Sequence, residues 1–424
     1  MKKFYIFLFF LLPLFSNAQS SADMAVELKA SIDTSKKSIK IFWKGVSSNP
    51  DIFIYRKLTN SSFWGAPIGT KKDDEAFFED LNISEGVEYD YCVRRAGYIT
   101  YDNFGYIRSG IGIKTKNERG MMLLVIENNL YQRLKPHFDT LLLDLVGDGW
   151  YIKLLTESNN SSHQTLKAKI ISAFDNYSGF KSIYLIGNLA IPYSGNFAPD
   201  AHPDHVGAWP ADVYYGLFDE NEWTDYNEVN LQATRPENRN TIGDGKFDQN
   251  SIRKNPDAAV GRLFLGKMSA FNNDTLLYQN YLSKAHQFKM NQINYSNKAL
   301  IDDNFGYFGG EAFASSAFRS YSPLVDSLIL GDYLSELRNS DYLMSYACGG
   351  GSYTSAGGVG SSSDFVNENI NTIFTGLFGS YFGDWDINNN FLRAPLANPN
   401  PALISFWSGR PHWHLFPLGL GYPM

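Results

Sequence analysis

The hydrophobic pattern changes character once along the chain, near residue 120. Between residues 22 and 117, apolar and polar residues alternate in short runs such as SIKIFWKG at 38–45 and DIFIYRKL at 51–58. Alternation with a period of two, interrupted by Gly, Asn and Ser, is typical of half-buried strands. The pattern predicts an all-β sandwich over this segment.

After residue 120, short apolar runs alternate with segments of helical spacing. The runs at 121–127, 150–156 and 182–188 predict buried strands, and 163–177 predicts a helix with Leu166, Ile170 and Phe174 on one face. Strand–helix alternation predicts parallel βαβ units. The same pattern continues with strands at 258–265, 298–304 and 402–413 and with helices at 267–290 and 313–337.

The N-terminus has the features of a secretory signal. Lys2 and Lys3 precede an apolar run at 4–15, and small residues follow at 16–18. The run is short for a membrane span, so we expect residues 1–18 to be a cleaved signal peptide. This predicts a secreted protein, extracellular, periplasmic or on the cell surface, with no membrane span after signal removal.

Charge and cysteine content narrow the functional classes. The formal net charge is −7, which argues against nucleic acid or an anionic membrane as a partner. Only two cysteines are present, Cys92 and Cys348, far apart in sequence. We expect two free thiols rather than a disulfide, with Cys92 a small buried core residue.

The first 117 residues resemble a fibronectin type III domain. The matching pieces are Trp43 on an early strand, IYRK at 54–57, Leu81, and the YDYCV strand at 89–93. The resemblance implies an immunoglobulin-like sandwich at 22–117, in which the Leu and the Tyr at these places are core and corner residues. Such domains are spacers or binding modules, so we assign no chemistry to this one.

Two neighbouring apolar runs near the C-terminus open into Gly- and Ser-rich loops. SYACGGG at 345–351 contains Cys348 and the triplet Gly349, Gly350 and Gly351, and TIFTGLFGSYFGDWD at 372–386 contains Ser380. The ends of buried strands are where α/β enzymes place catalytic groups. These two loops therefore mark the functional face of the second domain.

The order of motifs from residue 120 to the end is similar to the gingipain family of secreted cysteine peptidases. The pieces are SIYLIGN, IPYSG, WPADVYYG, GDGKFD and DAAVGRL, in that order. The resemblance implies a caspase-like α/β domain with a mostly parallel sheet over 120–424, truncation at the C-terminus being one interpretation. The family uses a His–Cys dyad, but here Gly349 stands at the His position, and Phe378, Gly379 or Ser380 at the Cys position.

Three functional interpretations follow from this departure. The first is a catalytically impaired or non-catalytic relative that binds a peptide, a protein or a glycan. The second is an active cysteine endopeptidase, with Cys348 as nucleophile, His412 or His414 as base, and the N–H groups of residues 349–351 as oxyanion hole. The third is a serine-type hydrolase at Ser380 with the same histidines as base and Asp384 or Asp386 as orienter. We favour the first.

The remaining polar segments suggest binding roles. Regular structure fades between residues 192 and 256, and loops this long are usually functional or stabilised by an ion. Asp212, Asp244 and Asp248 could hold a structural calcium ion, although Gly-Asp-Gly is also an ordinary turn, and no cofactor is required. Asp384, Trp385 and Asp386 are expected to line or close the groove. His202 and His205, three apart, suggest zinc, but the absence of an adjacent Cys or third His favours a structural loop.

Overall fold

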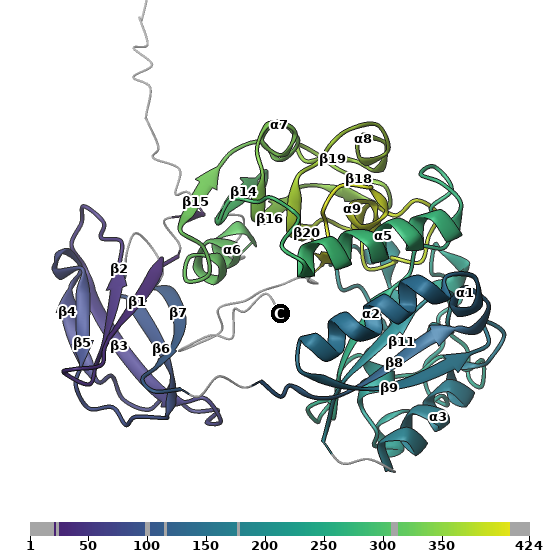
Figure 1. Ribbon diagram of the computed structural model, residues 1–424, viewed down its shortest axis with the longest axis horizontal. Helices are drawn as coiled ribbons and strands as arrows, with labels where there is room; N and C mark the ends of the chain where they lie inside the picture. Colours follow the sequence, from purple (N-terminus) through teal and green to yellow (C-terminus); the bar gives the residue numbers. More distant parts are fainter. Residues whose placement is uncertain are drawn as a thin grey trace, which may run out of the picture.

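The computed structural model describes residues 21–22, 25–97, 102–113, 117–175, 179–306 and 313–407. An all-β part precedes a larger α/β part, as the change of pattern near residue 120 predicts (Figure 1). The predicted signal peptide and the two histidines at 412 and 414 lie outside the described residues.

The N-terminal part has two antiparallel sheets with a common core. One has the order β1-β2-β5 and the other β4-β3-β6-β7. The side chains between them form one cluster that includes Ile41, Ile54 and Tyr91. The strands are β1 (Leu28–Asp33), β2 (Ser38–Trp43), β3 (Asp51–Leu58), β4 (Gly69–Lys72), β5 (Phe77–Asp80), β6 (Glu88–Arg95) and β7 (Asn103–Gly110).

Three residues of this part that the sequence singles out differ in their surroundings. Trp43 is buried and its indole N–H donates to the Asp73 carbonyl. The Tyr89 hydroxyl accepts a hydrogen bond from the Ser84 N–H, the back-bonding of a tyrosine corner. Leu81 is 66% exposed, so its expected core role is wrong. It directly follows β5, where the chain has already left the sheet.

The α/β part begins with a four-stranded parallel sheet of order β13-β10-β8-β9. Alternate residues of β8 face opposite sides: Leu124 contributes to the cluster that contains Phe138 of α2, and Leu123 to the cluster that contains Ile170 of α3. A strand covered on both faces must be apolar on both, which explains its continuous run. The elements are β8 (Gly120–Glu127), α1 (Asn128–Arg133), α2 (Lys135–Gly147), β9 (Trp150–Glu157), α3 (His163–Asp175), β10 (Phe180–Ile186) and β13 (Ala259–Leu263).

A second parallel sheet has the order β15-β14-β16-β20-β21. The α/β part therefore contains two parallel sheets, where the sequence indicated one. The helix expected at 313–337 is two helices separated by strand β15, whose run SLIL pairs with β14. The elements are α5 (Asp274–Lys289), β14 (Lys298–Asp303), α6 (Phe313–Tyr321), β15 (Ser327–Leu330), α7 (Tyr333–Asn339), β16 (Tyr342–Cys348), α8 (Ser362–Asn367), β20 (Thr372–Phe378), α9 (Ala394–Ala397) and β21 (Ile404–Phe406).

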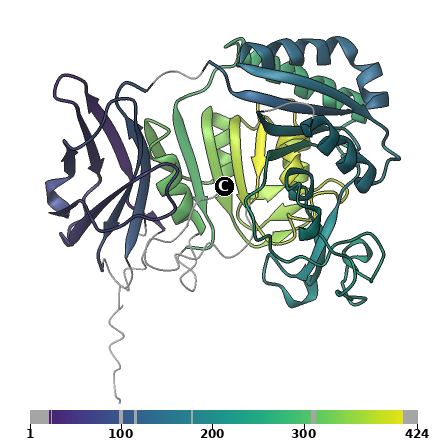
Figure 2. The ribbon, with the colours of Figure 1, turned by 90° about the horizontal axis from the view of Figure 1, so that it is seen from below.

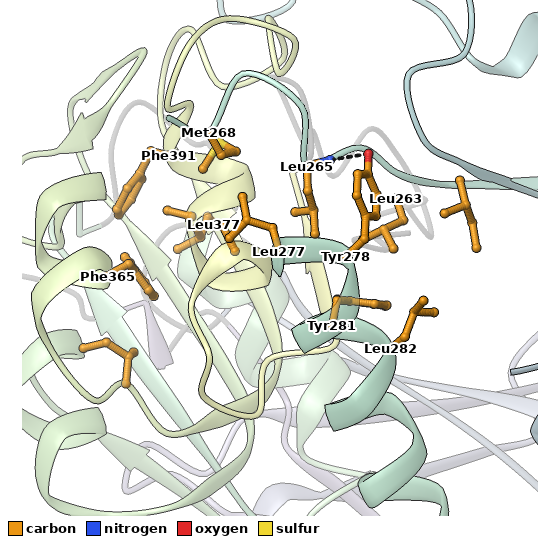
Figure 3. Close-up of a cluster of buried hydrophobic side chains, with 14 of the residues drawn as sticks. Leu263, Leu265, Met268, Leu277, Tyr278, Tyr281, Leu282, Phe365, Leu377 and Phe391 are labelled. Carbon is orange, nitrogen blue, oxygen red and sulfur yellow. Dashed lines mark hydrogen bonds between the residues drawn. The ribbon is translucent and has the colours of Figure 1, made fainter. Parts of the chain in front are cut away.

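The two parallel sheets are joined by a continuous apolar core. Helix α5 contributes Leu277 and Tyr281 to a cluster that also contains Leu263 of the first sheet and Leu377 of the second (Figure 3). The Tyr278 hydroxyl accepts a hydrogen bond from the Leu265 N–H, so this polar group has a partner inside the apolar core. The core fixes the second sheet relative to the first.

The segment between β10 and β13 has little regular structure, as expected. It contains the hairpin β11 (Tyr193–Phe197) and β12 (Gly207–Pro210), the short helix α4 (Val213–Gly216) and 3₁₀ turns at Pro203–His205 and Pro236–Asn238. We call residues 187–258 the insertion. Its hairpin packs against the end of the second sheet. The indole rings of Trp209, in β12, and Trp407, directly after β21, stack with centroids 6.0 Å apart.

The two parts of the chain pack against each other. Strand β7 lies beside helix α6 (Figures 1 and 2), and the Leu28 N–H donates to the Ser322 hydroxyl across the boundary. Within the described ranges, the helices are all too short or too polar to cross a membrane.

Candidate active site

Ser380 lies at the carboxyl end of strand β20, in a tightly packed turn. Its backbone passes so close to Gly351 that a Cβ added to that glycine would lie 2.3 Å from the Ser380 nitrogen and oxygen. The next residue, Tyr381, has a left-handed backbone with φ of 70°. Ser380 itself is half-buried. The turn therefore holds a hydroxyl in a fixed place that solvent can reach.

The glycine triplet after β16 forms one wall of this turn. The Gly349 N–H donates to the Phe378 carbonyl at 3.1 Å, so it is occupied by the fold. Gly351 begins a two-residue strand with Ser352 that pairs with Ser355–Ala356. Gly350 is exposed, and its N–H donates to no acceptor in the described part of the chain. Of the three, Gly350 has the donor best suited to a ligand.

Cys348 occupies a different environment from Ser380, although the strands that lead to them are adjacent. Its side chain is fully buried, beside the rings of Phe313 and Phe378. The thiol donates to the Asp303 carboxylate at 3.4 Å. Burial and this negative charge raise the pKa of the thiol well above its usual range. These are the surroundings of a protonated structural thiol, because nucleophilic cysteines need a depressed pKa and access to solvent.

The Ser380 hydroxyl contacts a histidine that belongs to the insertion. His202 Nε2 lies 2.6 Å from Ser380 Oγ, and the imidazole stacks on Tyr381 with centroids 5.3 Å apart. In the tautomer with its proton on Nδ1, His202 accepts the hydroxyl proton. The described residues place no carboxylate on Nδ1. Within the described ranges, this is a serine–histidine pair without an orienting acid.

A second histidine of the same turn, His205, is buried between two carboxylates. His205 Nδ1 is 2.7 Å from Asp200 Oδ2, and Nε2 is 2.7 Å from Asp384 Oδ2. Burial disfavours the charged imidazole, but the hydrogen bonds to Asp200 and Asp384 outweigh it and raise the pKa of His205 to about 9. His205 is therefore an imidazolium at neutral pH.

The network of buried charge continues away from Ser380. Arg235 donates to Asp384 Oδ1 at 2.8 Å and to Asp386 Oδ2 at 2.6 Å. The Tyr193 hydroxyl donates to Asp386 at 2.7 Å, and the Asn238 amide to Asp384 at 2.9 Å. Burial raises the pKa of Asp386, but Arg235 outweighs it and the pKa is below its usual range. We call Asp200, His205, Asp384, Arg235 and Asp386 the ion network; it ties the insertion to the loop after β20.

Several residues expected at the site have other roles here. Asp384 and Asp386 are buried rather than lining a groove, and Asp384 contacts His205, not the histidine beside Ser380. Trp385 is half-buried, with its ring 5.3 Å from the Arg262 guanidinium. His412 and His414, the bases considered from sequence, lie outside the described residues.

The three carboxylates considered for calcium do not form one cluster, and each already has hydrogen-bond or ion-pair partners. Asp212 pairs with Arg262, and Asp244 accepts the N–H groups of its own turn and approaches Lys246. Asp248 accepts hydrogen bonds from the Thr224 hydroxyl and from three N–H groups at 226–228. No cluster of three metal-ligating side chains occurs within the described ranges.

The sequence missed the residues that complete this site. His202 and His205 attracted attention only as a zinc-like pair, and Asp200 and Arg235 not at all. The partners of Ser380 and of Asp384 lie 178 and 179 positions away in sequence. Local pattern carries no information about contacts at that separation. The signal in the sequence was the HPDH string itself, two histidines beside an Asp in a long polar segment.

Comparison with known proteins gives distant matches in structure alone. No family model matches the sequence, and no curated protein is detectably similar. The crystal structure of the Arg-specific cysteine proteinase gingipain R (RgpB) matches at 11% identity and TM-score 0.41, covering 69% of this chain. The chain spans 62% of the length of that structure.

A complex of Porphyromonas gingivalis RgpB pro- and mature domains matches at 12% identity and TM-score 0.41, covering 67% of this chain and 63% of that one. Pectate lyase PelI from Erwinia chrysanthemi with tetragalacturonic acid matches at 10% identity and TM-score 0.18, covering 39% and 54%. The gingipain structures are thus distant structural neighbours of this chain.

Proposed function

We propose that the α/β part is a serine-type hydrolase of ester or amide bonds, with Ser380 as nucleophile and His202 as general base. The observation that carries the proposal is the 2.6 Å contact between Ser380 Oγ and His202 Nε2. A serine hydroxyl is a weak nucleophile until a base within hydrogen-bond distance accepts its proton. Both residues are half-buried, so neither is enclosed in the core.

The reaction follows from the positions of these groups. His202 takes the Ser380 proton as Oγ attacks the carbonyl carbon, and the resulting imidazolium donates that proton to the leaving alcohol or amine. Water then attacks the acyl-serine with His202 again as base, which releases the acid and restores Ser380. The exposed Gly350 N–H supports the proposal as a donor to the developing oxyanion. The resemblance of the sequence motifs to secreted peptidases favours a peptide as substrate and secretion of the protein.

Labelling by a fluorophosphonate, a probe that reacts with activated serines, tests the proposal. We expect mass spectrometry to locate the adduct on Ser380, no labelling in Ser380→Ala, and labelling at least 100-fold slower in His202→Ala. Ser352→Ala is the matched control, because this exposed serine of the facing hairpin contacts Ser355 rather than a histidine. A peptide library should be cleaved by the wild type and left intact by Ser380→Ala. Labelling of Ser380 at the same rate without His202 would contradict the assignment of the base.

A second candidate is a non-catalytic domain that binds a peptide or protein, with the N-terminal part as a fibronectin type III-like spacer. The observation in its favour is the missing carboxylate on His202 Nδ1 among the described residues, since an orienting acid normally fixes the base. This candidate predicts saturable peptide binding, measured by calorimetry, that survives Ser380→Ala, and no fluorophosphonate adduct at all. An adduct on Ser380 decides for the hydrolase.

A further inference from the structure

One carboxylate accepts backbone N–H groups from His202 and from Tyr381, the residue that follows Ser380. Asp200 Oδ2 accepts the N–H of Tyr381, the residue after Ser380, at 2.9 Å. Asp200 Oδ1 accepts the N–H of His202 at 3.4 Å. The distance between Ser380 Oγ and His202 Nε2 therefore depends on where Asp200 is held. Asp200 is only 1% exposed, so water does not substitute for its protein partners.

His205 holds Asp200 in place. Its Nδ1–H donates to the same Oδ2 that accepts the Tyr381 N–H, and its Nε2–H donates to Asp384 on the other side. The faces of the imidazole are covered by aromatic rings, with centroids at 4.2 Å for Trp209, 4.4 Å for Tyr381 and 6.0 Å for Tyr353. The charged groups that face His205 are these two carboxylates, with Arg235 behind Asp384.

We propose that His205, as an imidazolium, is the positioning residue of the Ser380–His202 pair, holding Asp200 so that it fixes the backbones of both partners. The inference rests on the proposed function and names what regulates its site. His205 does not touch the reacting atoms. It acts through Asp200, and only the form with two N–H groups can donate to both carboxylates at once.

Loss of one proton from His205 has a defined consequence. A neutral imidazole has one N–H, so one ring nitrogen then faces a carboxylate with its lone pair, and that contact is repulsive. Either Asp200 or Asp384 must move. Because the pKa of His205 is about 9, the site is assembled below that pH and loosens above it. The reactivity of Ser380 should therefore fall at alkaline pH while the protein is still folded.

The pH dependence of fluorophosphonate labelling tests the inference. Between pH 6 and 10.5, we expect the wild-type labelling rate to fall at least tenfold with an apparent pKa near 9. Asp384→Asn removes one of the two carboxylates that raise the pKa of His205. The labelling rate of this variant should therefore fall at a pH at least one unit lower than in the wild type. The matched control is Asp204→Asn, because this exposed carboxylate of the same turn accepts only the Tyr381 hydroxyl among the described residues. In this control, the labelling rate should fall at the same alkaline pH as in the wild type.

An NMR measurement separates failure of this inference from failure of the proposed function. In protein labelled with ¹⁵N-histidine and ¹⁵N-tyrosine, His205 should show two ring N–H protons at pH 7, and the Tyr381 amide should shift as His205 titrates. His205→Gln and Tyr381→Phe assign the two signals. A neutral His205 at pH 7, or a Tyr381 amide that ignores its titration, overturns the inference. The inference is also overturned if the labelling rate of Asp384→Asn falls at the same pH as that of the wild type. Complete absence of a Ser380 adduct overturns the proposed function, and with it the role of His205 in catalysis.

Discussion

Strands β16 and β20 are neighbours in one sheet, with Cys348 opposite Phe378 in register, yet their ends differ in chemistry. β16 ends in a thiol enclosed by aromatic rings and paired with a carboxylate. β20 is followed, two residues after Phe378, by a hydroxyl that contacts a histidine from the insertion. Position at the carboxyl end of a parallel strand is therefore not sufficient for a nucleophile. What distinguishes the two is access to solvent and a base within reach.

The largest effect is expected where the loop after β20 depends on the ion network. Arg235→Met leaves Asp386 buried without its cation and leaves Asp384 with His205 as its one charged partner within the described residues. Removing one partner of a buried ion pair costs about 3–5 kcal/mol, so we expect the free energy of unfolding in urea to fall by that amount. Arg239→Met is the matched control, because Arg239 is exposed and donates to a single carbonyl. Equal stability of the two variants would show that the network does not hold the loop.

The charge on His205 predicts a pH dependence that the end of β16 lacks. Its folded pKa of about 9 lies above the value of about 6.5 in an unfolded chain, so its stabilising contribution is complete below pH 6.5. The contribution is lost as the pH rises through 9. At 1.36 kcal/mol per pKa unit, the loss is about 3 kcal/mol. Urea unfolding at pH 6.5 and 9.5 should show this loss of unfolding free energy in the wild type but not in His205→Gln. The control Cys348→Ala should show the same loss as the wild type.

The close approach of the two loops predicts a smaller effect that depends on a single methyl group. A Cβ at Gly351 would overlap the backbone of Ser380, so Gly351→Ala should cost about 1–3 kcal/mol and slow fluorophosphonate labelling as Ser380 moves from His202. A Cβ at Gly147, the last residue of α2, meets nothing within 4 Å, so Gly147→Ala is the matched control. Thermal melting and labelling rates measure both effects. Equal behaviour of the two variants would argue that the loops are not in contact.

The smallest effect is expected at Cys348 itself. Cys348→Ala removes a buried sulfur and should lower the free energy of unfolding by about 1–2 kcal/mol, with labelling of Ser380 unchanged. Iodoacetamide should leave Cys348 unmodified in the folded protein and modify it quickly in urea, as mass spectrometry can follow. Rapid modification of the folded protein, with loss of peptide cleavage, would restore the cysteine-peptidase interpretation.

The sequence predicted what is local and missed what is distant. Continuous apolar runs identified β8 and β10 because strands covered on both faces need apolar residues throughout. The segment 313–337 was expected as one helix, because a short apolar run cannot be assigned to strand or helix by periodicity alone, and Leu328 to Leu330 form a strand. Ser380 was considered a nucleophile, but with histidines near it in sequence. Its actual partner, His202, is brought to it by the packing of the insertion.

The contact between His202 and Ser380 also has a consequence for biosynthesis. Because 178 positions separate the two, the base leaves the ribosome long before the nucleophile exists. The insertion likewise waits for its two buried counter-charges: until Asp384 and Asp386 are made, Arg235 has only the exposed Glu237 of the insertion as an ion-pair partner. We expect the insertion to be sensitive to added protease until residue 386 has emerged. For the proposed function, this order means that the Ser380–His202 pair forms only after residue 380 has emerged.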